Sequence, residues 1–209
     1  MQQQTFPTVA VERQHEASPV SDKASEAPKL ECMEDPRMAE FEVVKPLGQG
    51  QYGRVFLVRH KETGALLCWK AVKYGGLRAR EKQQLVAEVN IMRGLQHENI
   101  VQYFEHFVLR QQQQLFILME FCDAGDLQQQ IERAHRHLGG IPEARVLPVL
   151  LQLLRALAYC HEGVGPGKVQ VLHRDLKPSN VFLSTRSSSS SAAAAQQQQQ
   201  QQQQQLVVK

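Results

Sequence analysis

The 209-residue sequence lacks the features that mark several classes of protein. Its four cysteines stand far apart without a C-x-x-C pair, which favours reduced thiols in a cytosolic or nuclear protein. The most apolar window, residues 146–159, is short for a bilayer and contains Gln152 and Arg155. No basic-then-apolar signal pattern opens the chain, and a net charge of +3 gives no support for nucleic-acid or membrane partners. These absences predict a soluble, cytoplasmic protein, with the nucleus or the cytoskeleton as other locations.

Large apolar residues are scarce at both ends of the chain. Residues 1–40 are rich in Gln, Glu, Ser, Ala and Pro, and this composition predicts a disordered segment. Residues 184–205 form a low-complexity run of Ser, Ala and Gln. Between them the sequence is patterned, and the whole chain is 42% hydrophobic, so we expect one core-forming region that begins near Phe41.

The most informative stretch is Val171–Leu183, in which a polar loop lies between two short apolar segments. This loop holds Asp175, Lys177 and Asn180 within six positions. A carboxylate can accept a proton from a hydroxyl, a lysine can neutralise a phosphate, and an amide oxygen can ligate Mg²⁺. The loop therefore predicts phosphoryl-transfer chemistry rather than an ordinary charged turn.

A glycine pattern, G-x-G-x-x-G-x-V, is formed by Gly48, Gly50, Gly53 and Val55. Glycines let the backbone approach phosphates and present N–H groups to them. A dinucleotide-binding loop shares this pattern but opens a helix. Here a β-branched and aromatic segment follows, so we predict a strand–turn–strand flap over a nucleotide, with Leu47 and Val55 beside the base.

Two lysines lie on the next expected strand, and alternation places Lys70 and Lys73 on opposite faces. We choose Lys70 as the phosphate-binding lysine because its distance from the glycines is the more usual one; Lys73 is the alternative. Residues 78–95 predict a helix whose apolar stripe is bordered by Glu88. We expect Glu88 to pair with Lys70, within hydrogen-bonding reach.

Five motifs, taken in order, carry a resemblance to eukaryotic protein kinases from Phe41 to Leu183. The loop at 173–180 matches the H-R-D-L-x-x-x-N pattern of the kinase catalytic loop at every defined position. Within that family the chain resembles most the NIMA-related serine/threonine kinases. The strings that carry this are Trp69-Lys70, Tyr74-Gly75, Glu81-Lys82-Gln83, Leu85-Val86, Glu88-Val89-Asn90, Met119-Glu120, Gly125-Asp126-Leu127 and Val171 to Leu183.

The resemblance implies an α+β, protein-kinase-like fold. It implies a complete N-lobe and hinge over 41–122, with a five-stranded antiparallel sheet plus helix C, and a partial, mostly helical C-lobe over 123–209. It also implies ATP and Mg²⁺ as cofactors and a protein substrate with a Ser or Thr acceptor. The implied adenine contacts are Cys68, the gatekeeper Met119, and backbone groups of Glu120 and Cys122.

The remaining implied roles concern the ribose and the transferred phosphate. Asp126 would meet the ribose hydroxyls, and it is also a candidate N-cap for the helix that follows. Asp175 would accept or orient the proton of the substrate hydroxyl, and Lys177 would steady the γ-phosphate. Asn180 would hold one Mg²⁺. Lys177 followed by Pro178 is typical of Ser/Thr rather than Tyr kinases.

The sequence departs from the family after Leu183, where no D-F-G, activation loop or A-P-E follows. Two function classes therefore stay open. One is the front part of a serine/threonine kinase, inactive over these 209 residues alone; the other is a non-catalytic nucleotide-binding or interaction module. We further expect residues 206–209 to be the strand that returns from the low-complexity insertion to pair with the strand after the catalytic loop.

A helix is expected from Pro142 to about His161, with a broad apolar face. Its members are Val149, Leu150, Leu153, Leu154 and Leu157. In kinases, later helices cover such a face. We therefore expect the face to stay exposed in this chain and to lower its stability.

Overall fold

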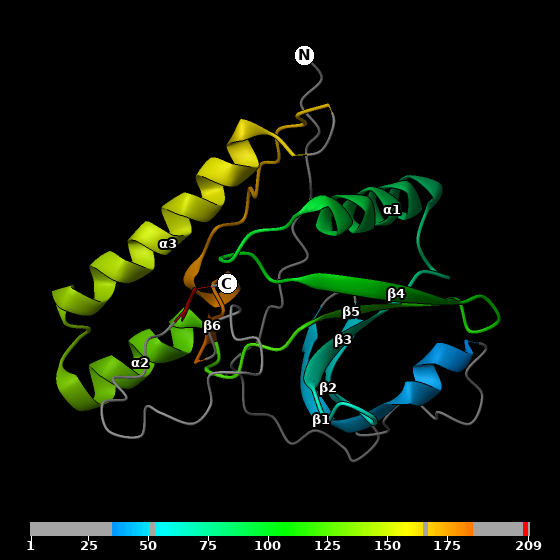
Figure 1. The fold of residues 1–209 in the computed structure, drawn as a ribbon, viewed down its shortest axis with the longest axis horizontal. Helices are drawn as coiled ribbons and strands as arrows, with labels where there is room; N and C mark the ends of the chain where they lie inside the picture. The colour runs from blue at the N-terminus through cyan, green and yellow to red at the C-terminus, as the bar shows by residue number, and fades with distance from the viewer. Residues whose placement is uncertain (1–34, 51–52, 165–166, 186–206, 209) are drawn as a thin grey trace. The chain divides into compact units, whose positions relative to one another are not determined.

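The computed structural model describes residues 35–50, 53–164, 167–185 and 207–208 (Figure 1). The described residues group into two compact units. The first holds residues 35–93 and 102–121, and the second holds residues 94–101 together with the chain from residue 122 onward. The fold class is α+β, as the sequence predicted.

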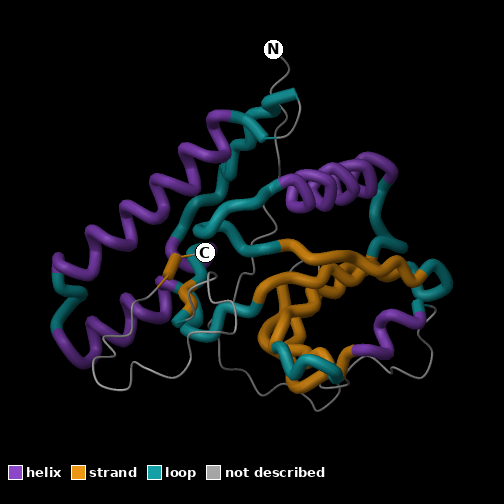
Figure 2. The backbone as a smooth tube through the Cα atoms, in the orientation of Figure 1, coloured by secondary structure: helices purple, strands orange, loops and turns teal. Residues whose placement is uncertain are grey.

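The first unit is built on an antiparallel sheet of five strands, in the spatial order β1-β2-β3-β5-β4. Figure 2 draws its strands in orange. The strands are β1 (Phe41–Gly50), β2 (Gly53–His60), β3 (Leu66–Lys73), β4 (Tyr103–Leu109) and β5 (Gln114–Glu120). Apolar aliphatic and aromatic residues dominate the inner strands, as expected for strands that pack on both faces. The predicted five-stranded sheet of the N-lobe is thus present.

Both faces of this sheet are buried. Alternation along β5 places Phe116 and Leu118 in one apolar cluster, and Leu115 and Ile117 in another. The second cluster includes Val89 of helix α1 (Ala79–Gly94), so α1 covers that face. The predicted helix over 78–95 is therefore confirmed within one residue at each end.

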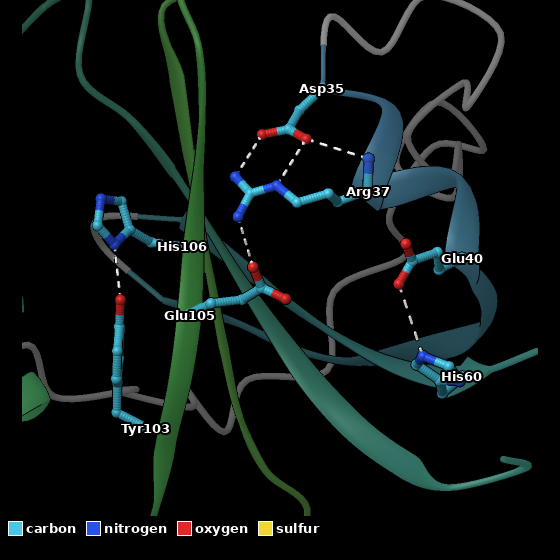
Figure 3. Close-up of polar contacts among 7 residues, drawn as sticks. All are labelled: Asp35, Arg37, Glu40, His60, Tyr103, Glu105 and His106. Atoms are coloured by element: carbon cyan, nitrogen blue, oxygen red, sulfur yellow. Dashed lines mark hydrogen bonds and ion pairs between the residues drawn. The ribbon is translucent and has the colours of Figure 1, made fainter.

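A short 3₁₀ helix, η2 (Pro36–Glu40), covers the opposite face through Met38, which is completely buried. Figure 3 shows Arg37 held between Asp35 and Glu105 of β4, at 2.6 and 2.8 Å. The Arg37 guanidinium also lies 5.0 Å from the centre of the Phe107 ring.

The prediction of disorder up to residue 40 is therefore wrong for Pro36–Glu40. This segment is ordered by tertiary contacts with a strand almost 70 residues away, which its own composition does not reveal. The rest of the segment predicted to be disordered, residues 1–34, lies outside the described residues.

The second unit is built on two helices, α2 (Leu127–Leu138) and α3 (Glu143–Glu162). Its small core is centred on Val181 and Leu183, against which Leu127 of α2 and Val149 and Leu153 of α3 pack. The helix predicted from Pro142 to about His161 agrees with α3 within one residue at each end. Within the described part of the chain, no helix is long and apolar enough to cross a membrane.

Residues 94–101 belong to the second unit, although the sequence placed them in the N-lobe. The Tyr159 hydroxyl accepts a hydrogen bond from the Gln96 amide at 3.0 Å, and the Tyr159 and His97 rings lie 5.1 Å apart. Asn99 is buried, and its amide group donates to Gln152 at 3.0 Å. Because of these contacts with α3, residues 94–101 belong with the C-terminal part of the chain, and a single boundary at residue 122 does not separate the two units.

The predicted return strand is confirmed at Val207–Val208, but Ser184, which the sequence assigned to the low-complexity insertion, belongs to the strand that it pairs with. β6 (Leu183–Ser184) pairs antiparallel with β7 (Val207–Val208), with Leu183 opposite Val208 and Ser184 opposite Val207. Most of the low-complexity run between them, residues 186–206, lies outside the described residues.

Helix α3 divides its apolar residues between core and solvent. Val149 and Leu153 pack against the core, while Leu150 and Leu154 are 46% and 52% exposed. Val146, Leu147 and Leu151 are exposed as well. Exposure of large aliphatic side chains along one helix is a feature of surfaces that bind apolar partners or dyes.

We therefore expect the chain to bind an apolar fluorescent dye through the outer face of α3. Leu150→Gln with Leu154→Gln should reduce dye fluorescence without lowering the melting temperature, because neither side chain is buried. Leu153→Gln is the matched control and should lower the melting temperature, since it places a polar group in the core. Dye titration and thermal melting of the three proteins check this; unchanged fluorescence in the double variant would contradict it.

Candidate active site

The glycine flap is formed by the ends of β1 and β2. Gly48 lies opposite Val55, and Gly50 lies opposite Gly53. A Cβ atom at Gly53 would overlap the carbonyl oxygen of Ala71 on β3, so only glycine fits there. The structure thus confirms that two paired strands flank the glycine pattern and excludes the loop-to-helix alternative; residues 51–52, between the strands, lie outside the described residues.

Predicted nucleotide contacts line one face of the sheet. Val55 is directly opposite Lys70, and Cys68 has Leu57 on one side and Met119 on the other. Because Phe56 and Trp69 belong to the cluster beneath η2, the alternate residues Val55, Cys68 and Lys70 share the face that α1 covers. The flap, the predicted lysine and the predicted gatekeeper are therefore on the same side of the sheet.

Lys70 and Glu88 interact electrostatically. Burial lowers the pKa of Lys70, and the Glu88 charge opposes this; burial raises the pKa of Glu88, and the Lys70 charge opposes that. For both groups burial is the larger effect. Among the described residues, however, no ion pair within 4.0 Å joins the two, so the predicted hydrogen-bonding contact is not formed.

Lys73, the alternative, lies on the opposite face at the end of β3 and is exposed. Water solvates the charge of an exposed ammonium, so an acidic partner adds little stability there. The structure therefore places Lys70, rather than Lys73, in the electrostatic field of Glu88, although it does not test phosphate binding by either.

The Cys68 thiol is buried, and burial raises its pKa to about 12. Because the thiolate is the nucleophile, we expect Cys68 to resist alkylation at pH 8 in the folded chain and to react quickly in urea. Peptide mapping after iodoacetamide treatment measures this. Cys122, which is only half-buried, provides the internal comparison; labelling of Cys68 as fast as Cys122 in the folded chain would contradict the prediction.

The segment after β5 contains the predicted adenine and ribose contacts. The Glu120 N–H donates to the carbonyl of Gln102 at 2.9 Å, so a contact from Glu120 to adenine would have to come from its carbonyl oxygen. Cys122 follows and is half-buried. Asp126 is the N-cap of α2, where its carboxylate accepts from the Gln129 amide at 2.8 Å. The capping role is confirmed, while the ribose role stays a prediction.

The catalytic loop brings its three predicted groups together. The Asp175 carboxylate lies 3.3 Å from the Lys177 ammonium and accepts a hydrogen bond from the Asn180 amide at 2.9 Å. The same Asn180 nitrogen donates to the Asp175 carbonyl at 2.8 Å. Arg174 has a φ of 65°, a left-handed conformation that is uncommon for a non-glycine residue. This turn presents the Asp175 carboxylate between its two partners.

The Asn180 side chain is fixed in orientation, because its nitrogen is used twice by Asp175. Its carboxamide oxygen is then the group directed away from Asp175. An amide oxygen is a suitable ligand for Mg²⁺. Asn180 therefore fits one part of a magnesium site. The described residues contain no group of three or more acidic, His or Cys side chains that could hold a metal.

The sequence did not predict the contacts that Asp123 and Phe182 make between the segment after β5 and the segment after the catalytic loop. The Asp123 carboxylate accepts the amide and hydroxyl hydrogens of Thr185, and Phe182 forms an antiparallel bridge with Asp126. Val181 and Leu183 enter the core, so alternation turns Phe182 to the other side. That apolar-aromatic-apolar alternation was the available signal for Phe182; nothing local distinguishes Asp123.

Comparison with known proteins agrees with this geometry. Residues 41–192 match the family model described as "Protein kinase domain". The chain therefore belongs to the protein kinase family.

Its relatives include NIMA-related kinases. The chain is 57% identical over 152 residues to "Serine/threonine-protein kinase Nek1" of Toxoplasma gondii and 43% identical over 150 residues to "Serine/threonine-protein kinase Nek2" of mouse. It is 35% identical over 167 residues to "G2-specific protein kinase nimA" of Emericella nidulans. These matches cover 73%, 72% and 70% of the chain but 10%, 34% and 24% of the respective relatives. The chain is a NIMA-like protein kinase sequence that spans about a third or less of these curated relatives.

Proposed function

We propose that the protein transfers the γ-phosphoryl group of ATP to Ser or Thr hydroxyls of a protein substrate. The observation that carries this is the catalytic loop, in which one carboxylate is held by both a lysine and an asparagine. Its relatives carry the name serine/threonine-protein kinase, which supports the same reaction. Lys177 followed by Pro178 supports Ser/Thr over Tyr acceptors.

In this reaction a bond forms between the substrate oxygen and the γ-phosphorus, and the bond to the ADP oxygen breaks. The Asp175 carboxylate orients the substrate hydroxyl and takes its proton. Lys177 balances the Asp175 charge in the free loop and is placed to offset charge on the transferred phosphoryl group. A nucleotide-bound magnesium ion would supply charge neutralisation at the phosphates, and Asn180 is the residue that would hold it.

The nucleotide end of the site is assigned to the sheet face that carries the flap. Lys70 would contact the phosphates there, and Cys68 and Met119 would flank adenine, because these two residues are direct cross-strand neighbours. The pairing of Val55 with Lys70 ties the flap to the lysine in register. We also propose that the protein acts in the cytoplasm, with the nucleus or the cytoskeleton as other locations, because its widely spaced cysteines are typical of reduced thiols.

Incubation of the full-length protein with γ-labelled ATP, Mg²⁺ and peptide pools tests the proposal. The pools differ only in carrying Ser, Thr or Tyr as the acceptor. Label is expected on Ser and Thr peptides and not on Tyr peptides. Label on Tyr, or on none of the three in the presence of bound nucleotide, would contradict a serine/threonine kinase and favour a binding module.

A further inference from the structure

A short ladder of backbone hydrogen bonds joins the segment after β5 to the segment after the catalytic loop. The Leu127 amide donates to the Val181 carbonyl at 2.8 Å, and the Leu183 amide donates to the Gly125 carbonyl at 2.8 Å. The Ala124 amide then donates to the Leu183 carbonyl at 3.0 Å. This ladder lies within the second unit. In this pairing Asp126 forms a bridge with Phe182, two positions after Asn180.

The ladder ends at a side chain, Asp123. Its two carboxylate oxygens accept separately from Thr185, one from the amide at 2.8 Å and the other from the hydroxyl. Ser184, which is buried, also hydrogen-bonds to this carboxylate. Burial acts to raise the pKa of Asp123, but the hydrogen bonds from Thr185 and Ser184 outweigh it and lower the pKa. The carboxylate is therefore held as an ionised acceptor.

The Asp123 carboxylate with its hydrogen bonds from Ser184 and Thr185, called here the Asp123 lock, lies next to a long connection in the chain. Thr185 immediately precedes residues 186–206, and β6 and β7, which pair across that connection, share only two residue pairs. Closing a long connection costs more entropy than closing a tight turn. A pairing of two residues therefore gives the end of β6 little support. Asp123 supplies an anchor from the other side.

We propose that Asp123 is a positioning residue for nucleotide binding, because it closes the ladder at the root of the low-complexity run and so keeps Asp126 and Asn180 in register. This inference rests on the proposed function, since those two residues matter only if a magnesium nucleotide binds. Asp123 itself need not touch the nucleotide. Asp123 acts by holding Ser184 and Thr185, and these residues hold the backbone ladder that contains Asp126.

Hydrogen exchange and MgATP titration of the 209-residue chain test the proposal. Asp123→Ala should speed exchange of peptides that cover 181–185 by about tenfold, because three hydrogen bonds to a charged acceptor are lost. It should raise the Kd for MgATP by about tenfold while exchange in β1–β5 stays unchanged. Thr185→Val keeps the amide bond to Asp123 and should show a smaller effect in both measurements.

Two further variants separate positioning from general destabilisation. Asp123→Asn keeps the shape and a carbonyl acceptor for the Thr185 amide, so it should recover most of the MgATP affinity, and it remains informative if the alanine variant does not fold. The double variant Asp123→Ala with Thr185→Val should be no weaker than Asp123→Ala alone. Glu98→Ala, an exposed acidic position of the same unit, is the matched control and should change neither quantity.

The outcomes separate the inference from the proposed function. Unchanged exchange at 181–185 in Asp123→Ala would show that the lock does not hold this segment. Faster exchange with an unchanged Kd would overturn the positioning role. If the wild-type chain does not bind MgATP, the proposed function fails and the positioning role falls with it.

Discussion

Replacing Asp175 with Asn is expected to lower the rate of phosphoryl transfer by about 10²- to 10⁴-fold. Asn has the size of Asp and can still accept the hydrogen bond from Asn180, but it carries no charge and cannot take the substrate proton. The Lys177 ammonium, 3.3 Å away, also loses its anionic partner. The loop geometry is thus kept while the proposed base is removed.

The measurement is the initial rate of γ-phosphate transfer by the full-length protein at saturating MgATP. Glu98→Gln is the control, since it makes the same chemical change at an exposed position. The KM for ATP should change little, because Asp175 is assigned to the acceptor hydroxyl. An Asp175→Asn protein that keeps more than about a tenth of wild-type activity would remove Asp175 from the role of base.

Replacing Lys70 with Met should make the protein less stable at pH 7.5 than at pH 4.5, relative to wild type, by about 1 kcal/mol, a value reduced for the partial exposure of Glu88. The comparison is made between two pH values because removing the buried Lys70 ammonium also relieves its own burial cost. Burial raises the pKa of Glu88, and the Lys70 charge limits that rise. Without Lys70 the pKa of folded Glu88 rises further above its unfolded value. An acid with a raised folded pKa stabilises the fold below its unfolded pKa and loses that contribution as pH rises through the folded pKa.

The penalty should therefore be small near pH 4.5, the ordinary value for Glu88, and grow toward neutral pH. Urea unfolding of wild type and Lys70→Met at pH 4.5 and 7.5 measures it. Adding Glu88→Gln to Lys70→Met removes the unpaired charge and should recover most of the loss at pH 7.5. A penalty that is equal at the two pH values, or that the second change does not relieve, would show that the two residues are not coupled.

Patterns that are local in the sequence predicted most of the fold. The glycines at 48, 50 and 53 are followed by β-branched residues, and the strand pair that this predicted is present. The period of the apolar residues gave α1 within one residue at each end. The choice between Lys70 and Lys73 also rested on a local property, the number of residues that separate each lysine from the glycines.

Contacts between distant segments could not be predicted in this way. Pro36–Glu40 is too short to show a period, and it is held by Arg37 and Glu105, which are 68 positions apart. Asp123 and Thr185 are 62 positions apart and have no motif of their own. The missing direct contact between Lys70 and Glu88 has a similar cause, because the placement of α1 on the sheet is set by packing of many apolar residues.

Binding of MgATP to the 209-residue chain, followed by calorimetry, tests most directly the claim that Lys70 and Asn180 each contribute to binding of a magnesium nucleotide. Wild type should bind ATP only in the presence of Mg²⁺. Lys70→Met and Asn180→Ala should each weaken that binding by about tenfold or more, while Glu98→Ala should bind as wild type does. Equal affinity in all four proteins, or binding that does not depend on Mg²⁺, would contradict the account.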